Sequence, residues 1–285
     1  MAYMPTRREF MAGTAAVISG MGGIGAFADT PSSSPLPFPL IDLHVHLDNS
    51  TIDAVLPLAT ERKVKFGIVE HAGTRENVYP TVLSNDEELL RYLAMLEGKP
   101  VWKGVQAEWT DWMGCFSKGA ALKLDYVLTD TLTFPDPEGK RMKLWERTDG
   151  LGSAQEFMDR YVDWHLKIME EQPVDILANV SWLPAPYAEN YDALWTDARI
   201  GKVIDTAKKQ QVAIEISSGF QLPKLHFLQI AKDAGIKFSF GSNGRYPKMG
   251  LLEYSVKLAR ELALTADHLF VPGKGAKAVE RRWPK

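Results

Sequence analysis

The segment Pro39–His46 (PLIDLHVH) decides the fold and marks the candidate site. Its apolar residues predict a buried strand, and the strand ends in two histidines, His44 and His46, spaced i, i+2. Side chains at this spacing leave a strand on the same face, so both imidazoles can converge on one point. Two convergent imidazoles at the carboxyl end of a barrel strand are typical of a divalent-metal site. The alternative is a pair of polar strand-end histidines that bind nothing.

Short apolar runs alternate with amphipathic stretches after this segment. Seven strands that alternate with helices predict a parallel sheet, and the handedness of βαβ connections favours its closure into a barrel. An open doubly wound sheet is the alternative, but no Gly-x-Gly-x-x-Gly motif follows a strand to support it. The expected strands are Leu40–Val45, Val64–Val69, Val101–Ala107, Tyr126–Leu128, Val174–Val180, Val212–Ile216 and Ile236–Phe240; the expected helices are Ile52–Arg62, Asp86–Leu96, Ser153–Glu171, Asn190–Lys209, Leu222–Ala234 and Leu251–Leu264.

The N-terminal residues have the layout of a twin-arginine signal peptide. The pair Arg7-Arg8 precedes a mildly apolar stretch that contains five glycines and ends in Ala26-Phe27-Ala28, a small-x-small cleavage signal. A short membrane anchor is the alternative, but the glycines and the cleavage signal favour removal. We therefore expect residues 1–28 to be a signal peptide, residues 29–38 a linker, and residues 39–285 a single domain. Export by the twin-arginine machinery to the periplasm or beyond, with no membrane span left after cleavage, follows from this prediction.

Composition narrows the class of partner. Cleavage after Ala28 leaves 257 residues with 31 basic and 35 acidic side chains, a net charge of −4. No basic stripe is available to neutralise phosphates, which argues against a nucleic-acid partner. Cys115 is the only cysteine, so the exported domain relies on its core rather than on disulfides. A small-molecule substrate is the partner that remains.

Polar side chains stand at the ends of the next two strands as well. Glu70 and His71 end the second strand, and Gln106 and Glu108 share one face at the end of the third. Carboxylates suit both metal bridging and general-base catalysis, so Glu108 and Glu70 are candidate catalytic residues. A rim carboxylate that faces water is the alternative for Glu108. The other histidines, His165, His226 and His268, lie in helical or late-loop contexts and are interpreted as structural or surface residues.

The order of these motifs resembles the PHP family, the polymerase and histidinol phosphatase type phosphoesterases. The matching residues are the His-x-His of the first strand, the acid–His pair of the second and the third strand Gly104–Glu108, and the resemblance covers most of residues 39–270. It implies a distorted (β/α)7 barrel with a centre of two or three metals. By this resemblance His44, His46 and His71 are metal ligands, and Glu108 joins them.

Several positions depart from the family pattern. Gln106 stands where a bridging Glu is expected, Asn179 replaces a histidine, and Asn243 and Arg245 stand where Asp-x-His would complete the site. Asn is a weak neutral ligand and Arg binds no cation. A full trinuclear centre is therefore not expected. We expect the remaining ligands to bind one or two ions of Zn, Mn or Fe, with Asp130 or Asp111 as an additional carboxylate ligand.

The replacements suggest an anionic substrate. Guanidinium groups bind phosphate or carboxylate in a bidentate fork, so Arg75 and Arg245 are candidate substrate-binding residues. Asn179, Asn243 and Trp109 are expected beside them. Aromatic residues are frequent in the predicted strand-to-helix loops, where they can stack on a substrate or roof the barrel: Trp109, Trp112, Trp182 and Tyr187.

Three functions remain open at this point. The first is an exported metal-dependent hydrolase, most simply a phosphoesterase. In this hypothesis a metal activates water, Glu108 or Glu70 orients or deprotonates that water, and Arg245 binds the anion. The second is an amidohydrolase-type hydrolase or lyase, which would require histidines where Asn179 and Ser217–Ser218 stand and an Asp at Asn243. The third is a non-catalytic binding protein that has kept the barrel and lost the metal cluster.

Overall fold

The computed structural model describes residues 36–284. The predicted signal peptide and most of the linker lie outside the described residues. No helix in the described part of the chain is long and apolar enough to cross a membrane.

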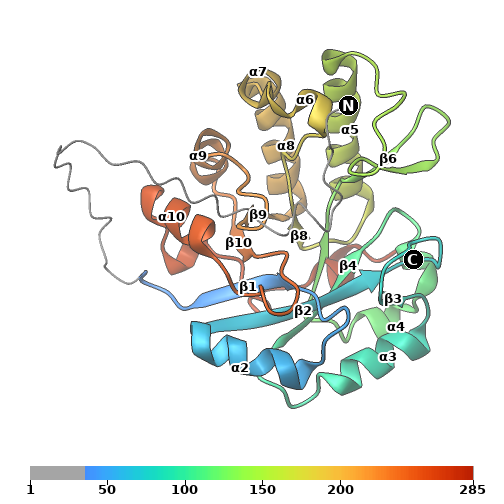
Figure 1. Ribbon diagram of the computed structural model, residues 1–285, viewed down its shortest axis with the longest axis vertical. Coiled ribbons are helices and arrows are strands. Elements are labelled where there is room, and N and C mark those ends of the chain that lie inside the picture. Colours follow the sequence, from blue (N-terminus) through green and yellow to red (C-terminus); the bar gives the residue numbers. More distant parts are fainter. Residues whose placement is uncertain (1–35, 285) are drawn as a thin grey trace, which may run out of the picture.

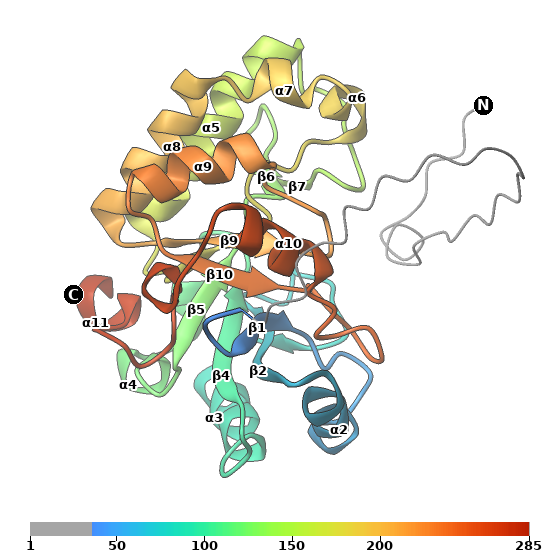
Figure 2. The ribbon, with the colours of Figure 1, turned by 90° about the vertical axis from the view of Figure 1, so that its left-hand side faces the viewer.

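Seven parallel strands form a nearly closed barrel (Figures 1 and 2). Backbone hydrogen bonds join the ends of the sheet just beyond the strands, from His46 N to Gly244 O at 2.9 Å and from Gly244 N to His44 O at 3.1 Å. The prediction of a distorted (β/α)7 barrel is therefore confirmed, and the open sheet is not adopted. In order around the barrel the strands are β1 (Leu40–Val45), β2 (Val64–Ala72), β4 (Trp102–Ala107), β5 (Tyr126–Thr129), β8 (Ile176–Leu177), β9 (Ala213–Ser217) and β10 (Phe238–Gly241), and the short β3 (Val82–Leu83) pairs with the end of β2.

Helices cover the outside of the barrel, with α5, α8 and α9 side by side on one flank and α2 and α3 on the other (Figure 2). Local signals begin these helices: Ser153 and Glu156 form a capping box at the start of α5, and Thr196 caps α8. The helices are α2 (Ile52–Arg62), α3 (Asp86–Met95), α4 (Lys118–Ala121), α5 (Ala154–Glu171), α6 (Ala185–Ala188), α7 (Tyr191–Leu194), α8 (Asp197–Gln210), α9 (Leu225–Asp233), α10 (Glu253–Glu261) and α11 (Ala278–Arg282), with 3-10 turns η1 (Trp112–Cys115) and η2 (Ala266–His268).

Several expected elements differ in the structure. The last two expected helices are shorter by up to three residues at an end, as α9 and α10. The strand β2 extends to Ala72, so Glu70 and His71 lie within it rather than after it. The expected strand Val174–Val180 is reduced to β8, and Asn179 and Ser181 just beyond it have positive φ angles of 50° and 72°, which strands do not accept. The expected helix Asn190–Lys209 is divided into α7 and α8, because Thr196 is extended and starts a new helix.

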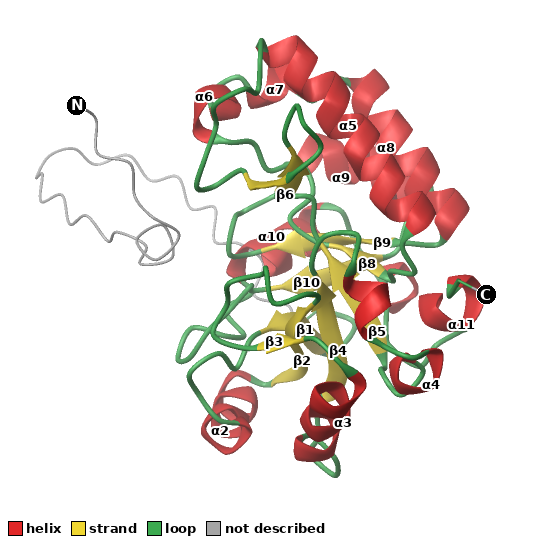
Figure 3. Cartoon of the chain, turned by 90° about the vertical axis from the view of Figure 1, so that its right-hand side faces the viewer, coloured by secondary structure: helices red, strands yellow, loops and turns green. Residues whose placement is uncertain are grey.

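An antiparallel hairpin that the sequence did not indicate, β6 (Thr133–Pro135) and β7 (Arg141–Lys143), follows β5. It projects from the side of the barrel toward which the β2 arrow points (Figures 1 and 3). This is the side of the carboxyl ends of the strands, where chemistry is expected in such barrels.

The barrel interior has an apolar floor below a polar layer. Tyr126 fills the floor: its ring lies against Gly67 and Gly104, and its hydroxyl donates to Leu43 O at 2.8 Å. A Cβ atom at either glycine would lie 2.4–2.5 Å from the Tyr126 side chain, so only glycine fits there. The buried floor residues are Leu43, Val69, Tyr126, Leu128, Ile176, Ala178 and Ala213.

The Asp42 carboxylate links β1 to the segment after β10, where the barrel closes. One of its carboxylate oxygens accepts from His44 N at 3.1 Å and Ser242 N at 3.0 Å; the other accepts from Ser242 Oγ at 2.5 Å and Gly250 N at 2.9 Å. Complete burial raises the pKa of Asp42, while these four hydrogen bonds oppose the rise. The buried carboxylate thus joins β1 to the segment after β10.

Candidate metal centre

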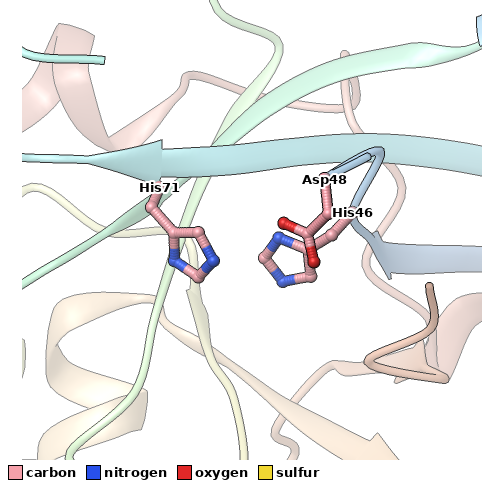
Figure 4. Close-up of side chains that lie close together, drawn as sticks. All are labelled: His46, Asp48 and His71. Carbon is pink, nitrogen blue, oxygen red and sulfur yellow. The ribbon is translucent and has the colours of Figure 1, made fainter. Parts of the chain in front are cut away.

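Three side chains converge at the carboxyl ends of β1 and β2: His46, Asp48 and His71 (Figure 4). Each offers one ligand atom, and these atoms all lie within 4.8 Å of one another. His46 and Asp48 come from the segment after β1 and face His71 across a small gap. Two imidazoles and one carboxylate at this separation form a ligand set that suits Zn, Fe or Mn.

The burial of the two histidines supports this interpretation. The His46 and His71 rings are nearly parallel, 17° apart, with centroids separated by 4.6 Å, and neither side chain is exposed to solvent. Polar groups buried to this degree need partners or ligands.

Asp48 supplies the carboxylate from a left-handed backbone conformation with φ of 46°. Its Oδ2 accepts from Arg245 Nε at 2.7 Å, whereas its Oδ1 is buried and accepts no hydrogen bond from the described residues. A buried carboxylate oxygen without a hydrogen-bond donor suits coordination of a cation. The residues present therefore fit a divalent metal ion.

Glu108 lies behind His71 rather than among the three donors. Its Oε1 lies 2.7 Å from His71 Nδ1, with both side chains buried. A carboxylate on the far nitrogen of a metal-ligating histidine fixes the ring orientation and raises its basicity. Tyr79 adds to this arrangement: its ring stacks on His71 at 3.6 Å and 7°, and its hydroxyl donates to Glu108 Oε2 at 3.3 Å.

Glu70 belongs to the opposite face of β2. Alternation along the strand turns Val69 and His71 into the barrel and Glu70 away from it. Glu70 Oε1 accepts from Leu47 N at 3.0 Å and Asp48 N at 3.3 Å, so it holds the backbone that carries Asp48. Burial, with a smaller contribution from the charge of Asp48, raises the pKa of Glu70 to about 8.

His44 takes part in a different set of contacts. Its Nδ1 lies 2.7 Å from Glu215 Oε2 and its Nε2 lies 3.1 Å from Gln106 Oε1. The cavity for this pair requires a glycine, because a Cβ atom at Gly241 would lie 2.2 Å from the Glu215 carboxylate. In this structure both ring nitrogens of His44 are therefore engaged by protein side chains.

The network continues across the distal half of the barrel. Gln106 Nε2 donates to Asp130 Oδ2 at 3.3 Å, and Asn179 Nδ2 donates to the same oxygen at 3.2 Å. Ser217 Oγ donates to Asn179 Oδ1 at 3.1 Å. Side chains of the protein thus occupy the part of the barrel where the family resemblance placed further metal ligands.

The predicted anion-binding arginines both have acidic partners. Arg75 pairs with Glu88 and is largely exposed, and Arg245 pairs with Asp48 and also donates to Asn243 Oδ1 at 2.8 Å. A cleft of about 440 Å³ between the segment after β1 and α3 is bordered by Arg75, Asp48 and Glu70. Arg75 therefore borders a cleft that reaches Asp48, one member of the metal group (His46, Asp48 and His71), and Arg245 contacts the same aspartate.

The aromatic residues divide between rim and core. Trp109 is partly exposed and packs on Trp164 with centroids 5.1 Å apart. Trp112, expected at the rim, is completely buried and donates to Gln172 Oε1 at 2.9 Å, so it belongs to the core. Of the remaining histidines, His165 is buried and His226 is exposed.

Three residues of the site were missed from the sequence. Asp48 continues the i, i+2 series of His44 and His46, and this spacing could have identified it. Glu215 is a single acid in a completely buried strand, where parallel barrels carry nearly continuous apolar runs. Tyr79 lies in a loop, and no local pattern indicates its position.

Comparisons with known proteins identify the fold only. No protein-family model matches the chain, and no curated protein matches it. Among solved structures, the chain is similar to the histidinol phosphate phosphatase of Lactococcus lactis subsp. lactis, which was crystallised with zinc, L-histidinol and phosphate. The TM-score is 0.55 and the sequence identity 12%, over 81% of this chain and 98% of the phosphatase. Identity this low establishes a shared architecture, not a shared activity.

Proposed function

We propose that this protein is a metal-dependent hydrolase of the PHP type, most simply a phosphoesterase. The observation that carries the proposal is the convergence of His46, Asp48 and His71 at the carboxyl end of a barrel that a phosphatase shares. A divalent ion of Zn, Mn or Fe bound there supplies a Lewis acid for the scissile group and acidifies water.

The residues of the chain have distinct tasks in this proposal. His46, His71 and Asp48 hold the ion, and Glu108 fixes the His71 ring through the 2.7 Å contact. Arg245 offsets the charge of Asp48 and leaves one carboxylate oxygen for the ion. The cleft that reaches Asp48 has Arg75 at its edge, and this arginine is the candidate contact for a small anionic substrate.

The contacts favour one ion rather than two. A second ion in the distal half would require His44, Gln106 and Asp130, which are joined by hydrogen bonds. Neutral Gln106 and Asn179 also provide less negative charge than carboxylates would.

The same network supports a second candidate, a non-catalytic binding protein with a PHP-like barrel. An amidohydrolase-type reaction has less support, because Asn179 and Ser217 are hydrogen-bonded to each other where that class requires histidines. Export through the twin-arginine pathway is a separate proposal, supported by Arg7-Arg8 and the cleavage signal at Ala28. Replacement of both arginines by lysine should retain the precursor inside the cell, as fractionation would show.

Metal analysis of protein folded in the cytoplasm is the decisive experiment, followed by a screen of phosphoesters. We expect about one equivalent of metal, lost in His46→Ala and His71→Ala together with metal-dependent phosphate release. His226→Ala is the matched control, since His226 is exposed and remote in sequence from the centre. Bound metal without turnover of any phosphoester would support the binding protein, whereas absence of metal would refute both the centre and the hydrolase.

A further inference from the structure

The β6–β7 hairpin directs two cations toward the metal group. Arg141 and Lys143 are two residues apart on β7, so their side chains leave the same face of the strand. Both are mostly buried, with 18% and 20% of their side chains exposed. This face meets the loop of residues 73–81, which joins β2 to β3 and carries Tyr79.

Arg141 links that loop to the segment that follows β4. Its guanidinium donates to Asn77 Oδ1 at 2.9 Å and to Thr74 Oγ1 at 3.4 Å, both in the loop. It also pairs with Asp111 at 2.5 Å, in the segment after β4, and with Glu76 at 3.3 Å. Thr74 Oγ1 donates to the same Asp111 carboxylate at 3.0 Å. Charge-assisted bonds from one planar fork fix several groups at once, which a lysine cannot reproduce.

Lys143 contacts the ring of Tyr79 directly. Its Nζ lies 5.0 Å from the centroid of the Tyr79 ring, within cation–π range, and pairs with Glu146 at 3.4 Å. His71 is stacked on the same ring at 3.6 Å. The tyrosine is therefore in contact with a hairpin cation and with a metal-group histidine.

The consequence of these contacts is burial of His71. His46 and His71 have no solvent exposure, although they lie at the open end of a barrel. Tyr79 covers His71, and the Glu108 carboxylate holds both residues. Solvent, metal ions and substrate can reach His71 from this side only when the loop and its tyrosine move away.

We propose that Arg141 and Lys143 are positioning residues that hold Tyr79 closed over His71 and thereby control access to the metal group. The inference rests on the proposed function for its metal-related part, but the closed position of Tyr79 can be tested in the metal-free protein. Arg141 contributes through the loop and Lys143 through the ring itself, so loss of Arg141 should open the centre more than loss of Lys143.

The first experiment measures how fast diethyl pyrocarbonate modifies each histidine of the metal-free protein, by peptide mass spectrometry. We expect modification of His71 to be about tenfold faster or more in Arg141→Ala and Tyr79→Ala, and smaller increases in Lys143→Ala and Arg141→Lys. Tyr79→Phe keeps the stacked ring and should retain most of the protection. Lys140→Ala, an exposed cation of the same hairpin, is the matched control.

Two histidines of the chain serve as internal standards. Exposed His226 should react at one rate in all variants, and buried His165 should stay protected unless a variant unfolds globally. Equal His71 protection in wild type, Tyr79→Ala and Arg141→Ala would overturn the proposal. A variant in which His165 also reacts is unfolding and is set aside. The proposal is then decided by comparing the rate of His71 modification in Tyr79→Phe with that in Tyr79→Ala, provided that His165 stays protected in both.

The second experiment measures transfer of bound zinc to an excess of chelator. Arg141→Ala should release the metal about tenfold faster, with a smaller change in equilibrium affinity, because the ligands are unchanged and only the path is opened. A protein that binds none of zinc, manganese and iron would refute the proposed function while leaving the histidine-modification result intact. Unchanged release rates with faster histidine modification would restrict the role of the hairpin to the metal-free state.

Discussion

At the scale of single residues, His44 and His46 show how neighbouring identical side chains acquire different chemistry. They leave one strand two positions apart, and their rings lie 5.2 Å from each other. His44 meets Glu215 and Gln106, whereas His46 meets the carboxylate and imidazole of the metal group. The shared face followed from the spacing in the sequence. The different partners follow from β9 and β2, which no local pattern reveals.

His165 provides a pH-dependent test at this scale. It is fully buried, and burial lowers its pKa from 6.5 to about 4. Above pH 6.5 the ring is neutral in both folded and unfolded chains; between pH 6.5 and 4 only the unfolded chain takes up the proton. The free energy of unfolding of the metal-free protein should therefore fall with decreasing pH, by about 2 kcal/mol from this residue at pH 5.

Urea titrations of wild type and His165→Gln at pH 7 and pH 5 measure this contribution. The wild type should lose about 2 kcal/mol more than the variant between the two pH values, because glutamine does not titrate. His226→Gln is the control, since it removes an exposed histidine and leaves the buried ring of His165 in place. Identical losses in wild type and His165→Gln would show that His165 titrates equally in both states.

At the scale of elements, Tyr126 in β5 depends on a glycine in the adjacent strand β4 and on another in β2, one strand further around the barrel. A Cβ atom at Gly104 would lie 2.5 Å from the Tyr126 ring. Gly104→Ala should therefore destabilise the barrel by about 1–3 kcal/mol or more, as overpacked cores do. Gly201→Ala in α8 is the matched control: nothing lies within 4 Å of its Cβ position, and alanine should stabilise that helix by about 0.5–1 kcal/mol. Urea midpoints that shift in the same direction for both variants would contradict this account.

Sequence patterns predicted these elements best where packing follows a simple period. The strands β1, β4, β9 and β10 were located to within about two residues, because buried parallel strands are continuous apolar runs. The shortness of β8 was not predictable, since Asn179 takes its positive φ angle where it also donates to Asp130. The strands of the β6–β7 hairpin have only three residues each, so the alternation of Arg141 and Lys143 about buried Met142 is too short to indicate a strand, and the segment resembled a loop.

At the scale of the whole molecule, closure of the barrel depends on Asp42. Each carboxylate oxygen accepts two hydrogen bonds, so Asp42→Asn places an amide NH₂ against two donors in either orientation. The expected loss is about 3 kcal/mol in the free energy of unfolding, from two buried donors without acceptors. Asp53→Asn is the control, because Asp53 is exposed and forms a surface ion pair with Lys99, and should change stability by less than about 0.5 kcal/mol. Equal stability of the two variants would show that Asp42 does not hold the closure together.

The metal group should also link ligand binding to the stability of the entire barrel. Its donors come from β2 and from the segment after β1, which is joined to Gly244 by the closing hydrogen bonds. An ion that binds only the folded chain stabilises it by about 2.7 kcal/mol at a free concentration one hundred times its Kd. For a domain of this size that corresponds to a rise of about 5–10 °C in Tm. Calorimetry with zinc and then with excess chelator should show this rise and its reversal in wild type and in His226→Ala, but not in His71→Ala. A rise of equal size in His71→Ala would place the stabilising ion elsewhere on the protein, and the centre at His46, Asp48 and His71 would lose its support.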